Sequence, residues 1–133
     1  MNSAIFLDTG YILAAINSAD NFHERAQTAA SQFKPPFITT EAVLIEIGNA
    51  LSKRRWRPVG VATLARLQNA SEIEIVPLDR SLLAEAIKLY SARADKEWGL
   101  TDCISFVVMQ TRGLTQVLTT DRHFEQAGFQ NLM

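Results

Sequence analysis

Apolar residues along the chain fall into short runs of strand length, separated by longer segments with helical spacing. Ala4–Leu7 and Phe37–Ile38 are such apolar runs, and Leu114–Leu118 is a third segment of strand length. Glu72–Val76 alternates polar and apolar residues, as expected of a half-buried strand. The pattern therefore predicts four strands.

Helices are predicted between these strands, with ends marked by capping and turn residues. We expect them within 11–16, 23–33, 40–57, 59–69, 79–96, 101–112 and 123–126. The third continues to Pro58, Gly10 lets the chain turn into the first helix, and Gly113 ends the helix that contains DCISFVVMQ. This alternation predicts an α/β fold with a parallel sheet covered on both faces.

The composition is that of a globular protein and excludes several classes of protein and of binding site. The 133 residues fit one domain, 1–133, and their 13 basic and 14 acidic side chains give a net charge of −1, so any nucleic-acid binding must depend on a local patch. A lone cysteine, Cys103, excludes an internal disulfide or a cysteine-clustered zinc site. The apolar runs are far shorter than the ~20 residues of a membrane span, and signal-peptide features are missing, which predicts a cytoplasmic protein without a membrane partner.

Two aspartates directly follow predicted strands, at the end where a parallel sheet binds its ligands. Asp8 is the one charge in the segment AIFLDTGYILAAI, and an unpaired carboxylate buried there would cost several kcal/mol, which suggests a partner. Asp121 follows the strand LTQVL, beside Thr119 and Thr120. The alternative for each aspartate is that it caps the next helix.

Two further acids lie on predicted helices. Glu46 projects along a mostly apolar stripe formed by Ala42, Val43, Asn49 and Ala50. The alternative is an edge position with its carboxylate in water. Asp102 opens an apolar, buried helix, and the hydroxyl of Ser105 follows one turn later. An acid in a first turn can also be structural, because it interacts favourably with the helix dipole.

Several carboxylates that converge on one crevice need a counter-charge. Two of them about 4 Å apart, at an effective dielectric near 20, repel by about 4 kcal/mol, so either protons or a cation must neutralise them. Oxygen ligands without clustered cysteine or paired histidine favour a hard cation, Mg²⁺ or Mn²⁺. Such an ion suits phosphoryl transfer, because it activates water and balances the charge of a phosphate.

Each of the four acids lies in a distinctive segment of the chain: FLDTGYILA, TEAVLIEIGNAL, WGLTDCISFVVM and LTTDRHFEQAGF. In this order, over nearly the whole chain, these segments resemble the motifs of a known family, the PIN-domain ribonucleases, and among them the VapC-type toxins of bacterial toxin–antitoxin pairs. The resemblance assigns the metal-binding, catalytic acids to Asp8, Glu46, Asp102 and Asp121. It assigns an auxiliary hydroxyl to Thr119, and Ser105 is a second candidate for that role.

The resemblance also implies a fold, an activity and partners. The expected fold is a PIN-like three-layer α/β/α sandwich with a central, mainly parallel sheet. The expected activity is that of a divalent-metal-dependent endoribonuclease, which hydrolyses RNA phosphodiester bonds with Mg²⁺ or Mn²⁺ as the toxin component of a type II toxin–antitoxin pair. The implied partners are the RNA substrate, a second copy in a homodimer and a small antitoxin protein that masks the site.

The segment KRRWR concentrates basic residues in the middle of the chain: Lys53, Arg54, Arg55 and Arg57. These side chains could bind RNA phosphates while Trp56 stacks on a base. The alternative is a solvated helix end, since cations are favoured at a helix C-terminus.

Four other residues are expected to serve packing. His23 and His123 lie a hundred residues apart, and we assign both to packing or to the surface. Cys103 precedes an apolar run and is expected to be a buried core thiol. Trp98 should pack as well, with a subunit interface as the alternative.

Other function classes fit the residues less well. The tripeptide D-T-G at 8–10 is also found in aspartic proteases, but those are built from strands, and no second D-T-G follows. A receiver domain needs a central phospho-accepting aspartate, yet 40–71 contains none, and a haloacid-type phosphatase needs an aspartate where Gly10 stands. A non-catalytic RNA- or protein-binding module on the same fold is the remaining alternative, although bare carboxylates repel phosphate.

Overall fold

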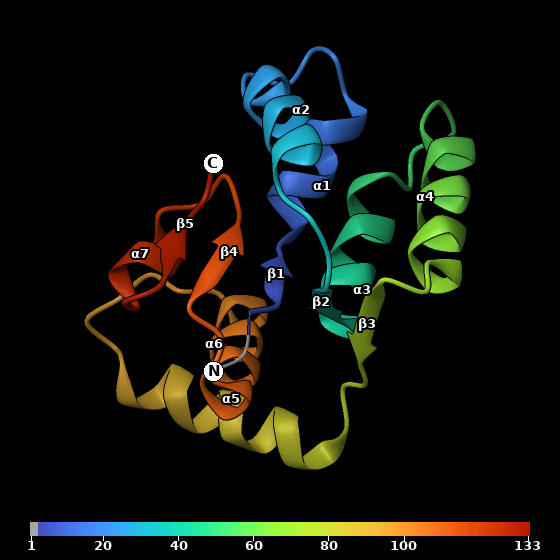
Figure 1. Ribbon diagram of the computed structural model, residues 1–133. Coiled ribbons are helices and arrows are strands. Elements are labelled where there is room, and N and C mark those ends of the chain that lie inside the picture. Colours follow the sequence, from blue (N-terminus) through green and yellow to red (C-terminus); the bar gives the residue numbers. More distant parts are fainter. Residues whose placement is uncertain (1–2) are drawn as a thin grey trace.

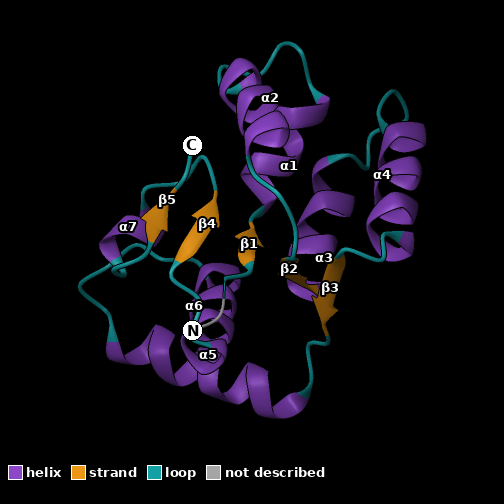
Figure 2. Ribbon diagram, in the orientation of Figure 1, coloured by secondary structure: helices purple, strands orange, loops and turns teal. Residues whose placement is uncertain are grey.

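A five-stranded sheet, in which every strand pairing is parallel, forms the centre of the computed structural model, which describes residues 3–133 (Figures 1 and 2). Its order is β3-β2-β1-β4-β5. The strands are β1 (Ile5–Leu7), β2 (Phe37–Thr40), β3 (Ile73–Val76), β4 (Gln116–Leu118) and β5 (Gln130–Asn131). β1 is buried along its whole length, which explains its unbroken apolar sequence.

Helices flank this sheet (Figure 1). In the described chain they are α1 (Thr9–Ile16), α2 (His23–Gln32), α3 (Glu41–Ala50), α4 (Arg57–Asn69), α5 (Arg80–Ala92), α6 (Leu100–Arg112) and α7 (His123–Gln126). α5 packs along α6, and α1 packs against α2 and α3. The predicted α/β fold with a central parallel sheet is confirmed. None of the helices within 3–133 is long and apolar enough to cross a membrane.

Some helix boundaries differ from the prediction, and one strand is not predicted. α3 ends at Ala50, and Pro58 lies in the first turn of α4, where proline is favoured because its missing N–H needs no partner there. α1 begins at Thr9, so Gly10 lies within the helix and not at a turn before it. The prediction misses β5, because two polar residues carry no apolar strand pattern.

The strand order reverses at β1, which lies between β2 and β4. Ligand sites of parallel sheets lie at such a reversal, beyond the carboxyl ends of the strands. Leu7 of β1 is in register with Leu118 of β4, and the N–H of Asp8 donates to the Leu118 carbonyl over 3.1 Å. The residues that follow these two strands, Asp8 and Thr119, therefore lie side by side.

An aromatic cluster fixes α6 and α7 against β1. Phe106 of α6 and Phe124 of α7 are buried and pack edge to face with ring centroids 4.9 Å apart, and Phe124 lies 6.1 Å from Phe6 of β1. Burial of a side chain of this size contributes about 1.5–3 kcal/mol. Trp98 packs on Phe106 at 5.0 Å and donates its indole N–H to Gln126, so it serves packing within the chain. The four-residue helix α7 is thereby held in place.

Candidate active site

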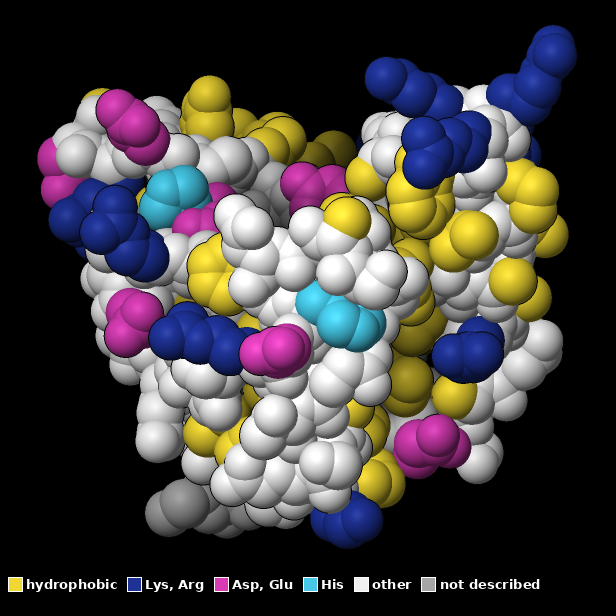
Figure 3. Space-filling model, turned by 90° about the horizontal axis from the view of Figure 1, so that it is seen from above, with side chains coloured by type: hydrophobic (Ala, Val, Ile, Leu, Met, Phe, Trp, Pro, Cys, Tyr) yellow, Lys and Arg dark blue, Asp and Glu magenta, His cyan; other side chains and the backbone are white. Residues whose placement is uncertain are grey.

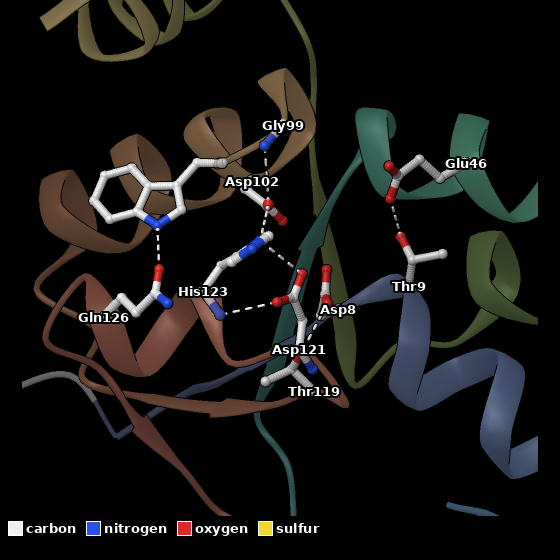
Figure 4. Close-up of polar contacts among 10 residues, drawn as sticks. Asp8, Thr9, Glu46, Gly99, Asp102, Thr119, Asp121, His123 and Gln126 are labelled. Carbon is white, nitrogen blue, oxygen red and sulfur yellow. Dashed lines mark hydrogen bonds and ion pairs between the residues drawn. The ribbon is translucent and has the colours of Figure 1, made fainter. Parts of the chain in front are cut away.

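A cleft of about 310 Å³ opens at the carboxyl ends of β1 and β4, and all four predicted acids line it. Its wall is formed by Asp8, Thr9, Gly10, Glu46, Gly99, Leu100, Thr101, Asp102, Thr120 and Asp121. Within residues 3–133, no lysine or arginine lines this cleft. Figure 4 shows Asp8, Asp102 and Asp121 gathered beside His123, with Glu46 set apart on α3.

Asp8 is buried at the end of the central strand. It is 6% exposed, and the hydroxyl of Thr119 donates to its Oδ2 over 2.7 Å. Asp8 has the extended backbone of a residue that precedes a helix, but its side chain accepts no capping hydrogen bond from the second or third residue of α1. Helix capping therefore does not account for this acid.

The buried position changes the protonation of Asp8. Burial raises its pKa from an ordinary 3.8 to about 7. Hydrogen bonds from the Thr119 hydroxyl and the Thr9 backbone lower this pKa in part, and the charges of Asp102 and Glu46 raise it further. A carboxylate here is costly to ionise alone, and a cation in the cleft would remove most of that cost.

Thr119 is buried after β4 and connects several parts of the site. While its hydroxyl donates to Asp8, the same oxygen accepts the backbone N–H of Asp121 over 3.0 Å. The side chain of Asn131 on β5 accepts the Thr119 N–H over 3.3 Å and donates to the Thr119 carbonyl over 3.1 Å. The hydroxyl predicted at Thr119 thus lies directly on Asp8, and β5 fixes its backbone.

Asp102 lies in the first turn of α6, where its Oδ2 has two partners. The N–H of Gly99 donates to it over 3.1 Å, so the structural role expected of an acid in a first turn is present. The same oxygen lies 2.8 Å from Nδ1 of His123. Burial raises the pKa of Asp102, the hydrogen bond with His123 lowers it and the charge of Asp121 raises it again, so the pKa stays above its ordinary value.

Asp121 uses both of its carboxylate oxygens on His123. Its Oδ1 accepts the His123 backbone N–H over 2.8 Å at the start of α7, although Arg122, not Asp121, occupies the N-cap position of this helix. Its Oδ2 lies 3.1 Å from Nδ1 of the same histidine. One imidazole nitrogen is therefore shared between Asp102 and Asp121 (Figure 4).

His123 is the site residue that sequence reasoning misses. Its partner Asp102 is 21 residues away, and the contact forms only when α7 docks beside the start of α6. The feature of the sequence that could have indicated its role is its position two residues after the candidate ligand Asp121. Burial lowers the pKa of His123, but the hydrogen bond with Asp102 and the charges of Asp121 and Asp102 outweigh this effect and raise it.

Glu46 lines the cleft from α3, but it is exposed, so the prediction of a buried apolar stripe is wrong and the edge alternative is right. Ala42 and Val43, one turn earlier, are buried, whereas the positions one turn later are exposed where α3 ends. The hydroxyl of Thr9 donates to Oε1 of Glu46 over 2.6 Å. This bond joins α3 to the first residue of α1.

Other residues singled out in the sequence lie away from the cleft wall. Ser105 is buried in α6, and its hydroxyl has no hydrogen-bond partner among residues 3–133, so the structure does not bring it to the cleft. Cys103 is buried, as predicted. His23 packs α2 onto α1, since its Nδ1 lies 2.8 Å from the Ala14 carbonyl oxygen.

Lys53, Arg54 and Arg55 lie in the turn between α3 and α4, and Arg57 begins α4, so the basic segment is solvated but does not form the C-terminal end of α3. Arg57 donates through Nε and Nη2 to the Ser52 carbonyl over 3.0 and 2.6 Å. The remaining basic side chains are exposed: Lys53, Arg54 and Arg55. On the face seen in Figure 3, basic side chains gather at the upper right, over the α3–α4 part, whereas acidic, histidine and further basic side chains lie together on the left.

The donor set fits a divalent cation. Asp102, Asp121 and His123 each offer one ligand atom, and these three atoms lie within 4.8 Å of one another. Asp8 lies on the same cleft, and its charge interacts with that of Asp102. Carboxylate oxygens are the ligands that Mg²⁺ and Mn²⁺ prefer, and a divalent ion would neutralise acids that no basic side chain on this wall neutralises.

Known proteins share both the sequence and the fold of this chain. The model of the PIN domain family matches residues 5–130. The chain is 30% identical over 126 residues to a protein of Mycobacterium tuberculosis named 23S rRNA-specific endonuclease VapC20, and the match covers 94% of this chain and 95% of that protein.

Solved structures give the same result. The crystal structure of Mycobacterium tuberculosis VapC20, described as a Sarcin-Ricin loop cleaving toxin, matches with a TM-score of 0.91 and 25% identity over 97% of this chain and 98% of that one. FitAcB from Neisseria gonorrhoeae shares the fold with a TM-score of 0.68 and 20% identity over 92% and 91% of the two chains. The resemblance seen in the four motifs is confirmed: the chain belongs to the PIN domain family.

Proposed function

We propose that this protein is a divalent-metal-dependent endoribonuclease, which hydrolyses RNA phosphodiester bonds, and that it is the toxin of a type II toxin–antitoxin pair. The observation that carries the proposal is a cleft with four carboxylates and no basic side chain on its described wall, at the reversal of strand order. Such a cleft repels an RNA phosphate when it is empty and attracts one when cations occupy it. A module that binds RNA without metal would not need these acids.

The four acids are the proposed ligands. Asp8, Asp102 and Asp121 would hold Mg²⁺ or Mn²⁺, and Glu46 completes the set from α3. When bound, the ion activates water and balances the charge of the phosphate during in-line displacement. The buried position of Asp8 keeps bulk water from competing for this carboxylate.

Neighbouring hydroxyls orient two of these acids before an ion arrives. Thr119 holds Oδ2 of Asp8, and Thr9 holds Oε1 of Glu46. Fixed ligands bind a metal more tightly, because less conformational freedom is lost on binding. Thr119 is therefore the auxiliary hydroxyl of the proposed site.

RNA is the proposed substrate, and the exposed side chains of Lys53, Arg54 and Arg55 are proposed phosphate contacts. Trp56 is half-buried beneath Arg55, whose guanidinium lies 5.6 Å from the ring centroid, so it offers less surface for stacking. The similarity to VapC20, whose name gives 23S rRNA as its target, makes 23S rRNA the first substrate to test.

A protein antitoxin is the proposed regulator. Chains of the same fold occur in a toxin–antitoxin complex from Klebsiella pneumoniae and in VapBC2 from Rickettsia felis, which supports an antitoxin partner. We propose that this partner covers the cleft. The proposal includes a homodimer, since Ile87 and Tyr90 of α5 expose apolar surface, and action in the cytoplasm, where RNA is accessible.

The test maps new RNA ends after incubating host RNA, intact ribosomes included, with antitoxin-free protein and Mg²⁺ or Mn²⁺. We expect discrete cuts that disappear with a chelator and with Asp8→Asn. Asp95→Asn is the matched control, because Asp95 is exposed and paired with Arg93 outside the cleft, and it should cut like the parent. Folded protein that makes no cuts, or cuts that survive both chelator and Asp8→Asn, would overturn the proposal.

A further inference from the structure

The proposed metal site contains a nitrogen donor beside the acids. Nδ1 of His123 lies 2.8 Å from Oδ2 of Asp102 and 3.1 Å from Oδ2 of Asp121. We infer that His123 is itself a metal ligand through Nδ1, together with Asp102 and Asp121, and that the site therefore prefers Mn²⁺ to Mg²⁺. The inference rests on the proposed function only for the presence of a divalent ion.

The spacing of the three atoms fits one shared ion. Neighbouring ligands of an octahedral ion with bonds of about 2.1 Å lie about 3.0 Å apart, which falls between the two nitrogen–oxygen distances. One N–H shared between the two carboxylate oxygens makes a bifurcated hydrogen bond, in which neither contact is linear. An ion between the three atoms would give each of them a direct partner instead.

The fold places His123 for this role. Its backbone N–H donates to Oδ1 of Asp121, and the next residue, Phe124, is anchored in the aromatic core. The His123 side chain is 28% exposed and lines an open cavity of about 710 Å³ next to the cleft. An ion can therefore reach Nδ1 from solvent without unfolding α7.

The nitrogen ligand determines which ion is favoured. Mg²⁺ takes oxygen ligands and gives up its water reluctantly, whereas imidazole suits transition metals. A site made of carboxylates alone has less reason to choose between Mg²⁺ and Mn²⁺. Replacing His123 with a residue that offers an oxygen ligand should therefore weaken Mn²⁺ binding more than Mg²⁺ binding.

The test uses Mn²⁺ as the probe, without RNA. Electron spin-echo spectra of Mn²⁺ bound to the protein should show modulation from a coordinated nitrogen. The chain contains two histidines, so His23, which contacts the Ala14 carbonyl far from the cleft, is the matched control. Nitrogen modulation should persist in His23→Gln and disappear in His123→Gln.

Calorimetric titrations with each ion add a quantitative readout. The ratio of Mn²⁺ to Mg²⁺ affinity should fall by about tenfold in His123→Gln and stay unchanged in His23→Gln. Labelling the parent protein with histidine that carries the heavier nitrogen isotope should alter the modulation, so the test does not depend on how the variant folds.

The outcomes separate this inference from the proposed function. Mn²⁺ that binds the parent protein without nitrogen modulation, or modulation that the histidine label does not alter, would overturn the role of His123 and leave a carboxylate metal site. Protein that binds neither Mn²⁺ nor Mg²⁺ would overturn the metal site itself, and the inference with it.

Discussion

Two carboxylates of the cleft, Asp8 and Glu46, are held in opposite ways. Asp8 is buried at the end of the central strand and accepts the hydroxyl of Thr119, which Asn131 clamps from β5. Glu46 is exposed on α3, and its carboxylate accepts the hydroxyl of Thr9 (Figure 4). The buried sheet thus fixes the position of Asp8, whereas Glu46 lies at the exposed rim of the cleft.

The difference is energetic as well as geometric. Burial raises the pKa of Asp8 to about 7, so the fold without metal opposes its ionisation at neutral pH. Glu46 is exposed on α3 and keeps its contact with water. The need for a cation is therefore concentrated at Asp8, while Glu46 adjusts how the ion or the substrate is held.

The largest expected effect is that of Asp8→Asn on RNA cleavage. Loss of this ligand should reduce the single-turnover cleavage rate by about 10³-fold, because a neutral amide cannot balance a divalent ion. Circular dichroism should show an intact fold. Cleavage within tenfold of the parent rate would show that Asp8 is not a ligand.

Stability without metal should depend on pH through Asp8. Its folded-state pKa of about 7 lies above the value of 3.8 expected when the chain is unfolded, so the folded protein binds this proton more tightly. The resulting stabilisation is complete below about pH 4 and is lost as pH rises through 7. At pH 8 the loss is about 4 kcal/mol.

Urea unfolding between pH 4 and pH 8, with a chelator present, measures this loss. Asp8→Asn cannot titrate, so its free energy of unfolding should fall less with pH than that of the parent. Parallel pH profiles for the two proteins would mean that Asp8 ionises without cost in the fold.

Thr119→Val tests the support of the buried acid. Valine has nearly the same shape as threonine but donates no hydrogen bond to Asp8, so metal affinity should fall by about 10–100-fold. Calorimetric titration of Mn²⁺ measures the change. Thr115→Val, at an exposed position before β4, is the matched control and should bind like the parent. Equal affinities of both variants would remove Thr119 from the site.

Changes at the rim should have the smallest effects. Glu46→Gln should slow cleavage by about tenfold, and Thr9→Val by less than that, because Glu46 reaches the cleft from an exposed helix position. Glu85→Gln, exposed on α5, serves as the control for the first change. If Glu46→Gln slowed cleavage more than Asp8→Asn, the distinction between the two carboxylates would be reversed.

Site residues can be predicted from the sequence where the neighbouring residues form a recognisable pattern. Asp8 is visible because an acid interrupts an apolar segment, and Asp121 because it follows a strand. The end of α3 is not visible, since no residue before Pro58 breaks a helix, and Pro58 marks the start of the next helix instead. The reason for Gly10 is also not visible in the sequence: a Cβ there would clash with Oγ1 of Thr120, a residue more than a hundred positions along the chain.

Long-range contacts account for the rest of the site that the sequence does not reveal. His123 joins it only because Phe124 anchors α7 in the aromatic core, next to the start of α6. Asn131 joins it because β5 pairs with β4, and the two polar residues of β5 give no strand pattern that would predict this pairing. Tertiary packing brings both residues to their partners, and the spacing of residues along the chain does not predict such contacts.

The most direct measurement is the free energy of unfolding at pH 8 as Mn²⁺ is added to the parent protein and to Asp8→Asn. An ion that binds only the folded state at a hundredfold excess over its Kd stabilises it by about 2.7 kcal/mol. We expect the parent to gain this stability and Asp8→Asn to gain little of it. Equal gains in both proteins, or none in the parent, would contradict a cation site built around Asp8.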